Sequence, residues 1–153
     1  MLAASGHLQQ LVSDFTADEA FSDITFTLAY ENDIKPYPVD KPIVAFTTDK
    51  TTIGEQLTIY NQDGSQVLSK NRIADTVIKT SIFVPYESGA LTCFEIFDRV
   101  FTKLLFSSSM KIVSSHCYNS SYVRDCGALV LTADFTIRST EKSWARAAVQ
   151  RIA

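Results

Sequence analysis

Cysteines and histidines are the residues of this chain whose types could support catalysis or metal binding. Cys93 could act as a thiolate nucleophile, but it lies among apolar residues spaced every three or four positions, where a small buried hydrophobic side chain is expected. His116 and Cys117 are adjacent in a predicted strand, so their side chains point to opposite faces and cannot share a metal ion there. We therefore expect neither a catalytic cysteine nor a zinc site built from Cys117, Cys126 and a histidine.

Paired carboxylates and phosphate-binding loops would also indicate an enzyme. Glu95 and Asp98 lie three residues apart, but on the polar side of a predicted helix, where a Glu95–Arg99 pair one turn apart explains them as solvated charge. His7 falls in a short first helix, where a surface or capping role is expected. The five glycines are scattered singly and form no phosphate-binding motif. The sequence thus predicts a protein that is not an enzyme and binds no cofactor.

Length and charge restrict the other classes. The chain has 153 residues, which suits one domain, and a formal net charge of −3. Residues 138–153 carry four basic groups and one acidic group, whereas residues 1–137 carry ten basic and sixteen acidic groups. The tyrosines at 37, 118 and 122 are not interleaved with basic residues, so no nucleic-acid groove is expected. The basic C-terminal segment is open to two interpretations, a solvated tail or a segment that docks on an acidic partner.

Cysteine count and hydropathy predict the compartment. Three cysteines leave one unpaired if two form a disulfide, and the first residues show no apolar signal-peptide segment. We therefore expect reduced thiols in a cytoplasm. No apolar run approaches the roughly 18 residues that a membrane span requires, so we expect a soluble protein without a membrane partner.

Hydrophobic periodicity predicts an α+β fold. A short helix is expected over residues 5–15, and a half-buried strand over residues 22–30, where apolar and polar residues alternate. Prolines at 36, 38 and 42 then predict an extended connection. Further strands are expected at Ile43–Thr48, Gln56–Tyr60 and Asp75–Pro85, with a glycine turn at Asn61–Gly64. The polar stretch from about Asn61 to Arg72 predicts an exposed hairpin arm.

The longest predicted element is an amphipathic helix over Ser88–Phe106, begun by Ser88 as its N-cap. Its expected apolar face consists of Cys93, Phe97, Val100 and Leu104, widened by Phe94, Phe101 and Leu105. Strands at Lys111–Tyr118 and Ala128–Arg138 follow, joined by an irregular tip. We expect one domain over residues 1–139, an antiparallel sheet with a mixed edge and the helix on one face, and a basic tail over 140–153 that can form a short helix around Trp144.

Two segments resemble tail terminator (tail completion) proteins of bacteriophages and of phage-tail-like bacteriocin particles. The run YPVDKPIVAFTTDKTTIG is similar to an early family segment through Pro38, Lys41, Pro42, Val44, Ile53 and Gly54. Residues 82–118 are similar to the family's strand, link, acidic helix and following strand through Val84, Pro85, Tyr86, Gly89, Cys93, Glu95, Phe97, Leu104, Leu105, Ile112, Ser115 and Cys117. The closing hairpin matches through Tyr122, Asp125 and Ala128, although Ser120, Ser121, Val123 and Arg124 replace the more acidic turn usual in the family.

The resemblance implies a structural ring of six subunits that caps the finished tail tube and, in contractile tails, the sheath. Its partners would be copies of itself, the tube and sheath proteins and the neck or connector, with DNA only passing through the lumen. The chain would be located in the virion, at the tail and neck, after assembly in the cytoplasm of a bacterial host. For contacts with partners we expect the polar arm and the basic tail, with Asp63, Lys70, Arg72, Tyr37, Trp144 and Arg146 as candidates.

Two other functions stay open at this point. One is a different neck or tail adaptor of the head-closure type on a related fold. The other is a small-ligand-binding α+β domain with its ligand between helix and sheet. The mass in solution distinguishes the terminator from the small-ligand domain. A terminator forms a ring, or is a monomer that forms a ring only on its tube, whereas the small-ligand domain is a stable monomer with a deep apolar pocket.

Overall fold

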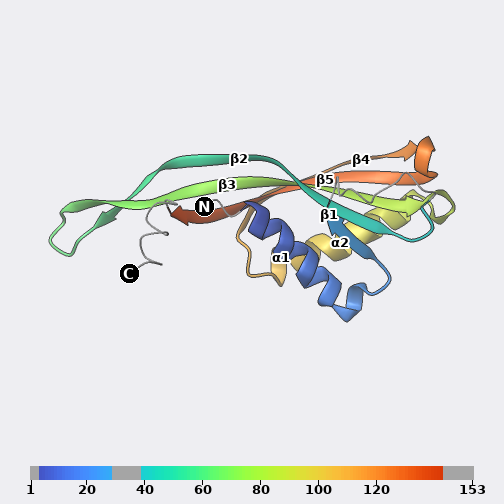
Figure 1. The fold of residues 1–153 in the computed structure, drawn as a ribbon, viewed down its shortest axis with the longest axis horizontal. Helices are drawn as coiled ribbons and strands as arrows, with labels where there is room; N and C mark the ends of the chain where they lie inside the picture. Colours follow the sequence, from blue (N-terminus) through green and yellow to red (C-terminus); the bar gives the residue numbers. More distant parts are fainter. Residues whose placement is uncertain (1–3, 29–38, 143–153) are drawn as a thin grey trace.

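The computed structural model describes residues 4–28 and 39–142, and in these residues the chain has an α+β fold with two α-helices and a five-stranded mixed sheet (Figure 1). The helices are α1 (Ala4–Ala17) and α2 (Ala90–Phe106). The strands are β1 (Thr25–Leu28), β2 (Ile43–Tyr60), β3 (Gln66–Pro85), β4 (Ile112–Val123) and β5 (Ala128–Lys142), in the spatial order β1-β2-β3-β5-β4. The predicted α+β class with a mixed sheet is confirmed. Neither described helix is long and apolar enough to cross a membrane.

One edge of the sheet is parallel and the rest is antiparallel. β1 runs parallel to β2 over four residue pairs, from Thr25 opposite Ile43 to Leu28 opposite Phe46. The Thr25 N–H also donates to the Pro42 carbonyl at 3.0 Å. The predicted strand at 22–30 begins later than expected, because residues 22–24 form a turn that follows the short 3₁₀ helix η1 (Glu19–Phe21). Tyr30 lies outside the described residues.

β2 and β3 are each longer than predicted. The expected strands at Ile43–Thr48 and Gln56–Tyr60 are one strand, because register shifts between positions 48 and 58 accommodate the polar stretch without ending the pairing. Residues 66–72 likewise continue into the predicted strand at Asp75–Pro85, and β3 ends at Pro85. Between the two strands, Gly64 has a φ of 86°, a left-handed conformation that explains the glycine in this turn.

β4 and β5 form the other side of the sheet. The predicted strand Lys111–Tyr118 is too short, because β4 runs to Val123 with an irregularity between Cys117 and Ser120. The segment expected to be an irregular tip therefore lies mostly within the strand, and the link shrinks to the 3₁₀ turn η3 (Arg124–Cys126). β5 extends to Lys142 alongside β3, and residues 143–153, with the short helix expected around Trp144, lie outside the described residues.

The hydrophobic core lies between the two helices and one face of the sheet. Alternate residues of the central strands point into it, as the period-two pattern predicts. Those of β3 are Ile78, Ile82 and Val84, and those of β5 are Leu131, Ala133, Phe135 and Ile137. From α1, Leu11 and Phe15 are buried, and the Phe15 ring stacks on Phe26 of β1 with 4.7 Å between centroids.

The start and the buried face of α2 differ from the prediction. The N-cap is Gly89, whose φ of 82° suits glycine, so the predicted Ser88 cap is wrong; Ser88 lies in the 3₁₀ turn η2 (Tyr86–Ser88). The buried residues of α2 are Cys93, Ile96, Val100, Phe101 and Leu104. Phe97 is only partly buried, and Phe94 and Leu105 are exposed. The apolar face is thus rotated toward Ile96, on the side of the helix where Arg99 and Lys103 bond to residues of η1 and α1.

Candidate interaction surfaces

The predicted arm begins at a polar turn organised by Asp63. Its carboxylate accepts hydrogen bonds from the Ser65 hydroxyl at 2.7 Å and from the Ser65 backbone N–H at 2.9 Å. Both bonds hold the pKa of Asp63 below its usual value, and the bond from the hydroxyl has the larger effect. Asn61 donates to the same hydroxyl at 2.9 Å. Asp63 therefore fixes the shape of an exposed turn and presents a negative charge at its end.

Arg72 lies farther along the same hairpin, where the register of β2 and β3 shifts. Its Nη1 donates to the backbone carbonyl of Gly54 at 2.9 Å, next to the irregularity between Ile53 and Gln56. A β-bulge disturbs the ladder of hydrogen bonds, and a long basic side chain can satisfy a carbonyl there. Arg72 is exposed and still has guanidinium donors that this bond does not use.

Of the other predicted contact residues, one lies on β3 and three lie outside the described residues. Tyr37, Trp144 and Arg146 lie outside the described residues, and Lys70 belongs to β3 but its side chain is not described. The structure therefore locates only Asp63 and Arg72 of the six candidates, both on the β2–β3 hairpin.

A row of polar residues crosses the sheet on the face opposite the helices. Thr47, Lys79, Asp134 and His116 lie opposite one another in β2, β3, β5 and β4. Asp134 is hydrogen-bonded to the His116 Nδ1 at 2.9 Å and accepts a bond from the Tyr118 hydroxyl at 2.8 Å. The second bond raises the pKa of Tyr118. The sheet thus carries a hydrogen-bonded polar strip on its open face.

Part of this strip is slightly hollowed. The hollow has a volume of about 290 Å³ and is lined by Asp49, Lys79, Tyr118, Thr132, Ala133 and Asp134. A second hollow of about 440 Å³ lies beside the ends of α1 and α2, lined by Asp14, Ala17, Asp18, Lys103, Ser107, Ser108 and Ser109. Both are open at the surface, and neither lies between α2 and the sheet.

The same open face holds an ion pair between neighbouring strands. Arg138 of β5 donates to both carboxylate oxygens of Asp75 in β3, at 2.9 and 3.1 Å. The two residues are directly opposite in the ladder, so the side chains meet without distorting it. This pair lowers the pKa of Asp75. Arg138, the first residue of the basic segment 138–153, therefore has its partner within the sheet.

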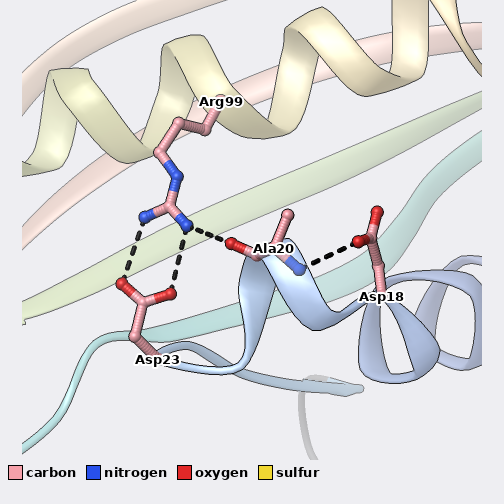
Figure 2. A network of polar contacts seen from close by, with 4 residues as sticks. All are labelled: Asp18, Ala20, Asp23 and Arg99. Carbon is pink, nitrogen blue, oxygen red and sulfur yellow. Dashed lines mark hydrogen bonds and ion pairs between the residues drawn. The ribbon is translucent and has the colours of Figure 1, made fainter.

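A polar clamp joins α2 to the end of α1 and to η1 (Figure 2). The guanidinium of Arg99 contacts both carboxylate oxygens of Asp23 at 3.1 Å and the Ala20 carbonyl at 2.6 Å. The Ala20 N–H in turn donates to Asp18 at 3.0 Å. Lys103 donates to Asp18 and to the Asp14 carbonyl, both at 3.0 Å. The predicted Glu95–Arg99 pair is therefore wrong: Arg99 pairs with Asp23 instead.

The thiols lie in different environments. Cys93 is buried in α2 as predicted, and this burial raises the pKa of its thiol, which opposes a nucleophilic role. Cys117 is exposed on β4, and partial desolvation, followed by the nearby Asp98 charge, raises the pKa of its thiol as well. In residues 4–28 and 39–142 the histidine, cysteine and carboxylate side chains form no group that could hold a metal ion.

Comparison with known proteins gives no family for the chain. No protein-family model matches it, and no curated protein is similar enough to count as a relative.

Two of these surfaces were not predicted from the sequence. The clamp joins positions 76 residues apart, and nothing in the local pattern around Asp23 indicates Arg99 as its partner. The polar strip had a partial signal, since Asp134 and Thr136 alternate with apolar residues in the predicted last strand. That alternation indicates an open face, but not which residues of β3 and β4 lie opposite Asp134.

Proposed function

We propose that this chain is a tail terminator: a structural ring subunit that caps the tail tube, and the sheath in a contractile tail, and connects it to the neck. The proposal starts from the resemblance of residues 37–54 and 82–137 to that family. In this account the chain is not an enzyme and needs no cofactor. It acts in the virion by contacts with copies of itself and with tube, sheath and connector proteins, after assembly in the host cytoplasm.

The observation that carries the proposal is the outer part of the β2–β3 hairpin. The last pair between β3 and β5 is Asn71 opposite Lys142. Farther out, Thr58–Tyr60 pair with Gln66–Leu68, and in the described residues no third strand joins them. An isolated two-stranded ribbon is marginally stable in water, so a ribbon of this length is favoured when a neighbouring molecule packs on it. The arm supports a subunit that contacts others.

The exposed groups of the ribbon suit such a contact. Tyr60 is 66% exposed near its end, and Ile53 is 44% exposed near its base. Asp63 and Arg72 add one charge of each sign, and both are already oriented by hydrogen bonds. Tyrosine and arginine are enriched where protein surfaces meet, because each combines a large contact area with specific hydrogen bonds.

The net charge agrees with a ring through which DNA passes. Each copy carries −3, so six copies total −18, and a negative lumen repels the phosphate backbone rather than binding it. A head-closure adaptor would share this property and the arm, and it stays the second candidate. The small-ligand domain has less support, because the space between α2 and the sheet is filled by core side chains such as Val100, Leu104 and Leu131.

The direct structural test is a cryo-electron microscopy map of the particle end. The proposal expects six copies of this chain on the last tube ring, with the β2–β3 hairpin of each touching a neighbour or the tube. If the chain lies only between the head and the first ring of the tail, the map supports the adaptor. A stable monomer that is absent from the particle would contradict both.

A further inference from the structure

The charges of α2 are separated onto two sides of the helix. Its two cations, Arg99 and Lys103, bond to carboxylates of Asp23 and Asp18 on the α1 side. Its two carboxylates, Glu95 and Asp98, are exposed and form no ion pair with any side chain that the structure describes. One flank of α2 is therefore neutralised within the fold, and the other flank is acidic.

Large apolar side chains also lie along the acidic flank. Leu91, Phe94, Asp98 and Leu105 follow one another at intervals of three, four and seven residues, which places them along one side of a helix. Leu91 is 70% exposed, Leu105 44% and Phe94 37%. Large apolar side chains in such a row are unusual on a free surface and are typical of a contact site.

β4 continues this surface. It is an edge strand, and almost all of its residues are exposed. α2 and β4 are in contact, and the charge of Asp98 on this flank reaches the thiol of Cys117 in β4. We name this area the α2–β4 surface, formed by Phe94, Asp98, Leu105, Ser115, Cys117 and Tyr122.

β4 lacks the proline and charged residues that often protect an edge strand, although its pairing with β5 shifts register at two places. Residues 112–123 contain no proline and no Lys, Arg, Asp or Glu. Free strand edges that carry no such residues readily accept another polypeptide. The acidic groups of the α2–β4 surface thus belong to α2 alone, next to an edge strand without charged residues.

We propose that the α2–β4 surface binds residues 143–153 of a neighbouring copy of this chain. That segment has the complementary chemistry: Arg146 and Arg151 without any acidic residue, together with the apolar Trp144, Val149 and Ile152. Arginine can pair with Glu95 and Asp98 while the apolar side chains cover Phe94 and Leu105.

The direction of β5 favours a neighbour over the same copy. β4 begins opposite Ile137, and β5 continues past that point to Lys142 along the outward-going hairpin. In Figure 1 the end of β5 points away from the start of α2 and from the β4–β5 turn. A segment that leaves in this direction would have to reverse to reach its own α2–β4 surface. The choice of a neighbouring copy rests on the proposed ring.

Photo-cross-linking of the full chain tests the proposal. The photoreactive amino acid benzoylphenylalanine replaces Trp144, and copies labelled with ¹⁴N and ¹⁵N are mixed before irradiation. We expect cross-links of mixed isotope composition from position 144 to residues 91–105 or 113–122. Asp98→Arg should lower their yield about threefold, as should Arg146→Asp, and the two changes together should restore it. Glu19→Arg is the matched control, because Glu19 lies in η1, across α2 from the acidic flank. This change should leave the yield unchanged.

Three results would overturn the inference: cross-links within single copies only, cross-links to other regions, or none at any concentration. An equal loss in Asp98→Arg and Glu19→Arg would also contradict it. The outcome is separable from that of the proposed function. If mixed cross-links form but loss of the chain leaves tail length unchanged, the inference stands and the terminator function is contradicted. If tails become too long without the chain but no mixed cross-links form, the terminator function stands and the inference is contradicted.

Discussion

Arg99 and Asp23 form an ion pair with two hydrogen bonds of 3.1 Å across 76 residues of sequence, and this pair fixes α2 against the turn that follows η1. Arg99 also lies over the Phe21 ring, with 5.2 Å from its guanidinium carbon to the ring centroid. The side chains of Arg99 and Asp23 are 39% and 62% exposed, so solvent weakens their attraction. The position of Arg99 therefore depends on packing and hydrogen bonding as well as on charge.

The first prediction concerns this clamp. Arg99→Ala should lower the free energy of unfolding by about 1–2 kcal/mol, because it removes the ion pair, the bond to the Ala20 carbonyl and the contact with Phe21. Asp23→Asn should cost less, about 0.5 kcal/mol. Urea unfolding measures both. Glu95→Ala is the control on the same helix and should change stability by under about 0.5 kcal/mol; a cost equal to that of Arg99→Ala would contradict the clamp.

The second prediction concerns pH. Bonds from Lys103 to Asp18 and from Arg99 to Asp23 lower the pKa values of both carboxyl groups in the folded protein. Each group therefore stabilises the fold above its unfolded pKa of about 3.9, and this stabilisation is lost as the pH falls through that value toward the folded pKa. Unfolding free energies measured between pH 7 and pH 3 should decrease below about pH 5. Asp23→Asn should make the decrease shallower, and an unchanged slope would show that Asp23 does not contribute.

The third prediction orders the aromatic residues of α2 by burial. Phe101→Ala should cost about 3–5 kcal/mol, since the ring is buried and lies edge-on to Phe135 at 5.6 Å. Phe97→Ala should cost less, because Phe97 is only partly buried. Phe94→Ala should cost least. Chemical denaturation gives the order, and a larger loss for Phe94 than for Phe101 would show that the helix face is assigned wrongly.

The fourth prediction concerns the arm, residues 61–72. The amide hydrogens of its outer part, residues 61–70, should exchange quickly in an isolated subunit and slowly in the assembled particle, because no third strand pairs with these residues in the described fold. Hydrogen-exchange mass spectrometry of both states measures this. The central pairs of β3 with β5 provide the internal control and should be protected in both. Strong, equal protection of the arm in both states would remove its role in contacts.

Local patterns predicted the class of the fold well, for a physical reason. The alternation from Leu129 to Arg138 identifies a strand with one buried face, and Leu131, Phe135 and Ile137 are indeed buried. The positive φ of Gly64 follows from the residue types of a turn. Both properties depend on neighbours in sequence, which is why they could be predicted.

Long-range properties were harder to predict. The Ser88 cap was wrong because a serine before a helix does not reveal whether the chain enters through a 3₁₀ turn and a glycine. The buried face of α2 is rotated toward Ile96, on the side where Arg99 and Lys103 bond to η1 and α1, and the pattern of α2 alone does not contain these partners. The continuity of β2 depends on pairing with β3 through irregular register, which no local propensity around Asp49–Glu55 indicates.

Electron micrographs of particles made without this chain test the central claim most directly. A ring on the growing end blocks the next tube ring, so its loss should leave polymerisation intact but remove the stop. The account predicts tails of broad, mostly excessive length without heads or neck. Arg72→Glu, which should keep the fold, is expected to give a weaker form of the same phenotype. Tails of normal, uniform length with heads attached in the deletion strain would contradict the terminator function.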